Sequence, residues 1–373
     1  MSSKAHNEHD VVDLLQAVVD TLPNVEARSG QVTMATAIAD AIANERHLIV
    51  QAGTGTGKTL GYLVPAIASG KRIVVSTYTK ALQDQLAKHD LPVLSQALTP
   101  IIGRDITWAV LKGRNNYLCA QRIAEIREPK QHKLDLQEFS IQVKSDIDKL
   151  VAWSETTNTG DSGDLSWSPR DTAWRHVSIG SDECPGASRC PSGDTCFAER
   201  ARDFASVADV IVVNTHIYGL DVATDGALLP EHDVVIFDEA HQLGPGAANA
   251  LLKVIEEPGA RTVWLLCAPT LSDVLATIRS RCRHLGLRTP SIKAVAKLLI
   301  ERDLISEDLA IFAAKASQGH IGVARYLATD KQVRDDRLTT LKIPLMITDI
   351  SSAYKAAQLL VDTAKARAEA DAE

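Results

Sequence analysis

A glycine-rich segment, Ala52 to Thr59 (AGTGTGKT), constrains the fold of this chain more than any other feature. It follows a short apolar run, residues 47–50, and precedes a helix-like run, residues 60–67. A strand, a glycine-rich turn, Lys-Thr and a helix in this order predict a phosphate-binding loop in a parallel α/β sheet. A plain glycine-rich turn is the less favoured alternative, because it would not require this order of elements.

The residues of this loop have separate expected roles. Lys58 would reach the β- and γ-phosphates of a nucleotide, and Thr59 would hold Mg²⁺. Glycines allow backbone N–H groups to converge on phosphate oxygens, and the helix N-terminus adds partial positive charge. The other expected nucleotide contacts are Gly53, Thr54, Gly55, Thr56 and Gly57.

An acidic motif far downstream supplies the second half of the predicted site. Residues 233–237 read as a buried parallel strand, and Asp238-Glu239-Ala240-His241 follows directly. Carboxylates at the C-terminal end of such a strand lie at the crevice where open sheets bind ligands. We expect Asp238 to hold Mg²⁺ and Glu239 to polarise the attacking water. Acidic residues after a strand often only begin a helix, so the hydrolysis of a nucleotide is predicted by the two motifs together.

Composition limits the class of protein. The chain has 373 residues, 45% apolar and 23% charged, which allows two or three globular domains. A net charge of −7 excludes a uniformly basic nucleic-acid binder but not a local basic groove. The first ten residues are polar and no apolar run approaches the roughly 20 residues that span a bilayer. We therefore expect a cytoplasmic protein with no membrane partner.

Alternating apolar and helix-like runs predict a mainly parallel, doubly wound sheet. Helices are expected at 11–22, 28–42, 80–88, 134–153 and 200–205, and strands at 72–77, 210–213 and 234–237. Residues 108–119 interrupt this alternation and lead to a segment rich in cysteine, proline and glycine.

Four cysteines, Cys119, Cys184, Cys190 and Cys196, lie between the two motifs. The last three have five residues between neighbours and are set among prolines and glycines. Four thiolates suit either a [4Fe–4S] cluster or structural zinc. Scattered free thiols are the alternative, but free buried cysteines normally lie in apolar stretches, as Cys267 does.

Residues 28–243 resemble the iron–sulfur helicases of superfamily 2, specifically the bacterial DinG-type branch related to XPD. The resemblance rests on Arg28, Gln31 and Met34, on the phosphate loop, on residues 76–86 and 111–119, on the cysteines and on the acidic motif. It implies that Arg28 and Gln31 contact the nucleotide, with Gln31 reading adenine, and that the four cysteines hold a [4Fe–4S] cluster. It also implies that His241 couples hydrolysis to DNA binding.

The same resemblance implies that Thr77, Thr79 and Gln83 lie near a single-stranded DNA path. Helix capping after a strand is the alternative role for these residues, and both could hold together. Clustered basic residues could contact phosphates or could form a solvated face; they are Lys112, Arg114, Arg122, Arg200 and Arg202.

Residues 246 to about 350 resemble the delta-prime subunit of the bacterial DNA polymerase III clamp loader. The matching segments are residues 246–258, 261–269, 277–282 and 317–325. The resemblance makes Arg281 a candidate arginine finger acting in trans, although a surface arginine at a helix end is the simpler interpretation.

Because both families place a strand, an acidic motif, a helix and a strand at the junction, we predict one continuous sheet in which residues 262–267 pair beside 234–237. The predicted organisation is a P-loop lobe with an iron–sulfur insert, a helical lid and a truncated helical tail. Its expected segments are 1–103 (first part of the lobe), 104–205 (insert), 206–243 (second part), 244–288 (clamp-loader-like completion), 289–335 (lid) and 336–373 (tail).

The combined prediction is a helicase-family ATPase that binds ATP, Mg²⁺ and single-stranded DNA and acts in DNA repair or replication. Since no second motor lobe follows in this sequence, we expect weak hydrolysis without a partner's arginine. One alternative is a clamp-loader scaffold that binds clamp-loader or other replisome subunits. The other is a fusion in which neither activity survives.

Overall fold

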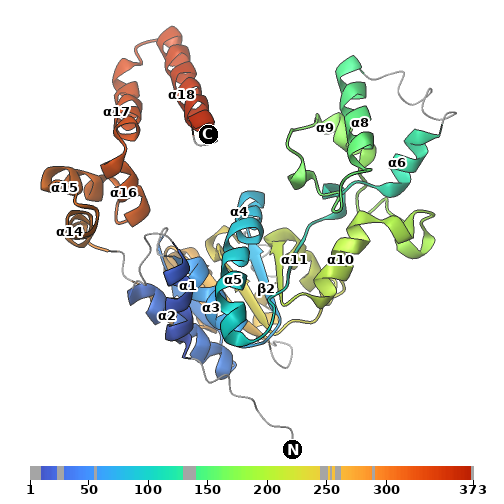
Figure 1. Cartoon of the computed structure of the whole chain (residues 1–373), viewed down its shortest axis with the longest axis horizontal. Helices are drawn as coiled ribbons and strands as arrows, with labels where there is room; N and C mark the ends of the chain where they lie inside the picture. The colour runs from blue at the N-terminus through green and yellow to red at the C-terminus, as the bar shows by residue number, and fades with distance from the viewer. Residues whose placement is uncertain are drawn as a thin grey trace, which may run out of the picture. The chain divides into compact units, whose positions relative to one another are not determined.

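The computed structural model describes residues 10–22, 29–53, 57–128, 140–243, 251–252, 254–256, 262–287 and 290–370. Two compact units divide the chain (Figure 1): residues 1–52 with 57–287, and residues 53–56 with 288–373.

A parallel sheet with seven described strands forms the centre of the first unit, in the order β3-β4-β2-β5-β6-β1-β7. The strands are β1 (Leu48–Gln51), β2 (Ile73–Thr77), β3 (Trp108–Leu111), β4 (Val210–Asn214), β5 (Val234–Phe237), β6 (Val263–Ala268) and β7 (Arg283–Gly286). The central strands β4, β2, β5 and β6 are buried along almost their whole length because helices cover both faces of the sheet. The predicted α/β, P-loop-type fold is confirmed.

Successive residues of the strands point to opposite faces of the sheet and pack in two separate hydrophobic cores. Val75, Ile236 and Leu265 point to one face, and Val74 and Phe237 point to the other. The first core includes α1 (Val11–Thr21), α2 (Ser29–Ala43), α3 (Lys58–Ala68) and α5 (Leu91–Ile102). The second includes α10 (Phe197–Val207), α11 (Thr215–Ala223) and α13 (Ala276–Arg279). α4 (Lys80–Gln85) and a π-helical turn (Leu86–Asp90) connect β2 to α5.

The junction between the two resemblances lies inside this sheet. β6 pairs with β5 through Val234↔Val263 and Ile236↔Leu265, and with β1 through Leu48↔Leu265. The prediction that residues 262–267 continue the sheet next to 234–237 is therefore confirmed. Two strands were not expected: β3, in the segment that interrupts the alternation, and β7. Both lie at sheet edges, where each pairs with one described neighbour.

The cysteine-bearing insert packs around its own apolar core. Its helices are α6 (Ala120–Arg127), α8 (Ile141–Trp153) and α9 (Asp171–Val177), and α10 returns the chain to the sheet (Figure 1). Ile147, Leu150 and Val177 are fully buried in this core.

The second unit is helical. α14 (Ile292–Asp303), α15 (Glu307–Ala316) and α16 (Ile321–Thr329) pack around Leu299, Ala313 and Leu327. α17 (Lys331–Met346) and α18 (Ile350–Ala370) follow. Among the described helices, none is long and apolar enough to cross a bilayer.

Candidate functional site

The phosphate loop leaves β1 and ends at Gly57, directly before α3. Gly57 has a φ of +75°, which an L side chain rarely adopts, and a Cβ there would lie 1.8 Å from Gln31 Nε2. Gln31 is buried, and its amide donates a hydrogen bond of 3.2 Å to Gly57 O. The structure thus places Gln31 against the loop backbone, and its contact with adenine stays a prediction.

Lys58 and Thr59 begin α3, and Gly53 follows the end of β1. Thr54, Gly55 and Thr56 lie outside the described residues, as does Arg28. The described part of the loop therefore has the predicted order of strand, glycine turn, lysine and helix.

The acidic motif lies beside this helix. Asp238 follows β5, is 8% exposed, and its Oδ1 lies 3.9 Å from Lys58 Nζ. This distance allows charge attraction but exceeds that of a hydrogen bond. Within the described structure, Asp238 Oδ1, Glu239 Oε2 and His241 Nδ1 are buried without hydrogen-bond partners.

Three unpaired buried polar atoms in one motif need an explanation, because each costs about 1–3 kcal/mol. Carboxylate oxygens are the ligands that Mg²⁺ prefers, directly or through water. The donor set of Asp238 and Glu239, opposite a lysine at a helix N-terminus, fits a hydrated Mg²⁺ bound to phosphates.

Burial also changes the acidity of this motif. Desolvation raises the pKa of Asp238 above its usual value, Lys58 opposes this shift, and Glu239 adds to it. Tyr62 on α3 is fully buried beside Asp238, and desolvation raises the pKa of its phenol. A further cation bound beside Asp238 would favour the ionised form of this carboxyl group.

The end of β2 contacts the acidic motif through the backbone. Ser76 O accepts a hydrogen bond of 3.1 Å from Asp238 N–H. Thr79 caps α4, accepting a bond of 3.2 Å from Leu82 N–H, so the capping role holds for this residue. Gln83 is fully buried with both side-chain polar atoms unpaired in the described structure. A DNA path beside Thr77, Thr79 and Gln83 stays a prediction.

The four predicted cysteine ligands lie together. Cys119, Cys184, Cys190 and Cys196 line one small cavity in the insert. Burial raises the pKa of the Cys119 thiol, while the backbone N–H groups of Arg122 and Gln121, at the start of α6, lower it in part. Among the described residues, no three Cys, His, Asp or Glu side chains come close enough to hold a single metal ion.

Most of the clustered basic residues are neutralised within the chain. Arg114 and Arg202 pair with Glu199, and Arg122 pairs with Glu183 at 2.8 Å. These pairs favour a structural role over direct contact with phosphates. Arg200 instead lies over the Phe197 ring, 4.6 Å from its centre.

Arg281 follows α13 and is held by its own chain. Its guanidinium pairs with Glu256 and donates a hydrogen bond of 2.6 Å to Thr277 O. This geometry fits the simpler interpretation, a surface arginine at a helix end, and a role in trans stays a prediction.

Sequence reasoning missed two features of the site. Tyr62 lies next to Asp238 because it is one turn beyond Lys58 on α3, a spacing that the sequence could have indicated. The pairing of Lys112 with Asp84 and Asp161 joins distant segments, and no local pattern signals it.

The fold and the motifs define the class: an α/β protein of the P-loop NTPase type, with a lysine and an acidic pair at the carboxyl ends of parallel strands. Residues 33–124 match the DEAD/DEAH box helicase family, and residues 194–291 match the family "DNA polymerase III, delta subunit".

The chain is 42% identical over 280 residues to the ATP-dependent helicase DinG of Mycobacterium tuberculosis, covering 71% of this chain and 42% of that protein. It is 43% identical over 227 residues to the ATP-dependent DNA helicase YoaA of Escherichia coli, covering 60% and 34%. The chain thus spans less than half the length of these relatives. The predicted DinG-type segment joined to a clamp-loader-like segment is confirmed by these matches.

Solved structures are similar only at low identity. An ATP-dependent RNA helicase from Sulfolobus tokodaii is 13% identical with a TM-score of 0.39, covering 78% of this chain and 65% of that chain. The RuvB Holliday junction branch migration motor of Thermotoga maritima is 12% identical with a TM-score of 0.32, covering 93% and 73%. The fold class therefore rests on the sheet itself.

Proposed function

We propose that this chain is an ATP hydrolase of the DNA helicase type, which binds ATP with Mg²⁺ and responds to single-stranded DNA. The observation that carries the proposal is the position of Lys58 opposite Asp238, next to buried acidic-motif atoms that lack partners. Such atoms are suited to bind a hydrated Mg²⁺, and the lysine at the start of α3 supplies positive charge for phosphates.

Each residue has a role in this proposal. Lys58 binds the β- and γ-phosphates, and Gly57 with Gly53 to Thr56 supplies loop backbone contacts. Asp238 and Thr59 would hold Mg²⁺, which neutralises charge on the phosphate oxygens when bound. Glu239 orients the attacking water and accepts its proton. His241 and Gln31 are proposed to connect this site to DNA and to adenine, respectively.

A direct test is ATP hydrolysis by the purified full chain, with and without single-stranded DNA. We expect a basal rate that DNA increases, and a loss of about 100-fold or more in Lys58→Met. Hydrolysis that does not change in Lys58→Met would show that another protein or another site is responsible.

We also propose that Cys119, Cys184, Cys190 and Cys196 hold a [4Fe–4S] cluster, with the reducing cytoplasm as the compartment. The four cysteines line one shared cavity, which supports a single group held by all four thiolates, and structural zinc is the alternative. The cluster would fix the ends of α6 and α10 together and so order the insert.

Replication or repair is the proposed setting, by analogy with the helicase relatives. The segment that matches the delta-subunit family completes the sheet, and clamp-loader or other replisome subunits are proposed as further partners. Co-purification with clamp-loader subunits tests this second proposal separately from hydrolysis.

A further inference from the structure

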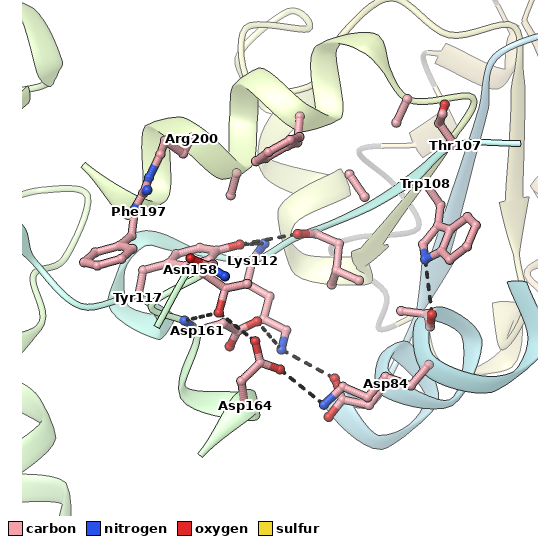
Figure 2. A pocket seen from close by; sticks show the side chains of 18 of the residues that line it. Asp84, Thr107, Trp108, Lys112, Tyr117, Asn158, Asp161, Asp164, Phe197 and Arg200 are labelled. Carbon is pink, nitrogen blue, oxygen red and sulfur yellow. Dashed lines mark hydrogen bonds and ion pairs between the residues drawn. The ribbon is translucent and has the colours of Figure 1, made fainter. Parts of the chain in front are cut away.

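Lys112 is a nearly buried cation shared by two parts of the first unit. It follows β3, and its side chain is 5% exposed. Its Nζ lies 2.7 Å from Asp161 Oδ2 in the insert and 3.5 Å from Asp84 Oδ1 on α4 (Figure 2). Because a buried ammonium is costly unless it is paired, the two carboxylates and the lysine stabilise one arrangement of insert and α4.

The loop around Asp161 is fitted to this cation. Gly163 N–H donates a hydrogen bond of 2.9 Å to Asp161 Oδ1. A Cβ at Gly163 would lie 2.8 Å from Lys112 Nζ, so a larger residue would push against the ammonium. Tyr117 OH accepts a hydrogen bond of 3.0 Å from the backbone N–H of Lys112, which holds the backbone at this residue.

The other partner of Lys112 leads toward the nucleotide site. Asp84 lies on α4, whose first turn is capped by Thr79, two residues after the end of β2. Near the end of β2, Ser76 O accepts the hydrogen bond from Asp238 N–H. A short run of backbone and one helix therefore connects the Lys112 pair to the acidic motif.

We propose that Lys112 is a positioning residue that holds the cysteine-bearing insert against α4 and couples the insert to the acidic motif. This inference rests on the proposed function, because the coupling can be measured only in an ATPase that responds to single-stranded DNA. With Lys112 in place, a displacement of the insert moves α4 and the end of β2; without it, the insert and the nucleotide site respond independently.

A second ion pair at the same interface offers a matched control. Lys88 Nζ lies 3.3 Å from Asp164 Oδ1 and also contacts Gly163 O at 3.2 Å, but both side chains are substantially exposed, at 48% and 38%. Exposed pairs contribute little to stability. Removing this pair should therefore leave the insert in place.

The test compares three full-chain variants: Lys112→Met, the neutral triple variant Asp84→Asn/Lys112→Met/Asp161→Asn, and Lys88→Met. Lys112→Met leaves two aspartates facing each other, whereas the triple variant removes that repulsion. We expect hydrogen exchange in residues 80–90 and 160–164 to become roughly tenfold faster in Lys112→Met, to recover in part in the triple variant, and to stay unchanged in Lys88→Met.

The second measurement is the ratio of ATP hydrolysis with and without single-stranded DNA. We expect the ratio to fall by about fivefold or more in Lys112→Met and in the triple variant, with basal hydrolysis within about twofold of the unaltered chain. If the role of Lys112 is only structural, the triple variant should regain the DNA stimulation ratio to the same extent as it regains slow hydrogen exchange. That result would overturn the coupling. Absence of DNA stimulation in the unaltered chain would instead refute the proposed function.

Discussion

Ile236 of β5 and Leu265 of β6 are direct neighbours in the sheet, and Leu265 is in turn the neighbour of Leu48 in β1. The strand that precedes the acidic motif and the strand that precedes the phosphate loop are thus joined through β6. β6 lies in the segment that resembles a clamp-loader subunit. The nucleotide site therefore depends on both the helicase-like segment and the clamp-loader-like segment.

Replacing Leu265 with alanine should destabilise the first unit by about 2–5 kcal/mol, because it opens a cavity at a fully buried position between the two motifs. All five tryptophans of the chain lie between residues 108 and 264, so tryptophan fluorescence during urea unfolding reports this unit.

Leu327→Ala is the matched control, since Leu327 is buried in the second unit. The free energy of unfolding that tryptophan fluorescence reports should stay within about 0.5 kcal/mol of that of the unaltered chain. Equal shifts in both variants would contradict a separate first unit held together by β6.

Much of this sheet could be predicted from the sequence. The buried strands are continuous apolar runs, and β5 was expected at 234–237, where it lies. The edge strand β7 (RHLG) was missed because it is mostly exposed and carries almost no apolar pattern, so that its backbone pairing with β1 defines it. The other edge strand, β3 (WAVL), is a short apolar run that was interpreted as part of an interruption.

Asp238→Asn should stabilise the protein without nucleotide while abolishing hydrolysis. Burial raises the pKa of Asp238, so the folded state binds its proton more tightly than the unfolded state does. Stability from this group is then present at low pH and is lost as pH rises from the unfolded value of 3.8 through the folded pKa. We expect the free energy of unfolding of Asp238→Asn to exceed that of the unaltered chain by about 1–3 kcal/mol at pH 7. This difference should disappear near pH 3, as measured by urea unfolding across pH.

Lys58→Met provides the opposite case at the same site. It removes the cation that opposes the shift at Asp238, so stability at pH 7 should fall while stability near pH 3 changes little. Equal pH profiles for the two variants would mean that Asp238 and Lys58 do not interact in the folded chain.

Gly57→Ala should damage the phosphate loop. The new Cβ would collide with the Gln31 amide, and the backbone would keep a left-handed conformation that costs about 1–2 kcal/mol for alanine. The thermal midpoint and the affinity for a nonhydrolysable ATP analogue should both fall.

Gly30→Ala is a control from the neighbouring helix. A Cβ at Gly30 meets nothing within 4 Å, so alanine should raise helix stability by about 0.5–1 kcal/mol. If Gly57→Ala behaved like Gly30→Ala, the close approach of Gln31 to the loop would be wrong.

Cys190→Ser should prevent binding of the proposed [4Fe–4S] cluster. We expect about four iron and four sulfide per unaltered chain, and little of either in the variant. Cys282→Ser is the control, because Cys282 lies outside the cysteine cavity and burial raises the pKa of its thiol to about 11. One zinc ion and no iron per chain would show that the cysteines hold structural zinc and would contradict the proposed cluster.

The site was predictable as far as its motifs are continuous in sequence. Lys58 and Asp238 are 180 residues apart, yet each is the residue that a strand and a turn place at the carboxyl edge of a sheet. The Lys112 pairs are different, since Asp84, Lys112 and Asp161 belong to no common motif and meet only because the insert folds back on α4.

Nucleotide binding tests the central claim most directly. Calorimetric titration of the full chain with a nonhydrolysable ATP analogue should give one site per chain, with a dissociation constant between about 1 µM and 1 mM that weakens when Mg²⁺ is removed. The Mg²⁺ dependence should disappear in Asp238→Asn. Binding that is absent, or that is equal with and without Mg²⁺ in the unaltered chain, would contradict a site formed by the phosphate loop and the acidic motif.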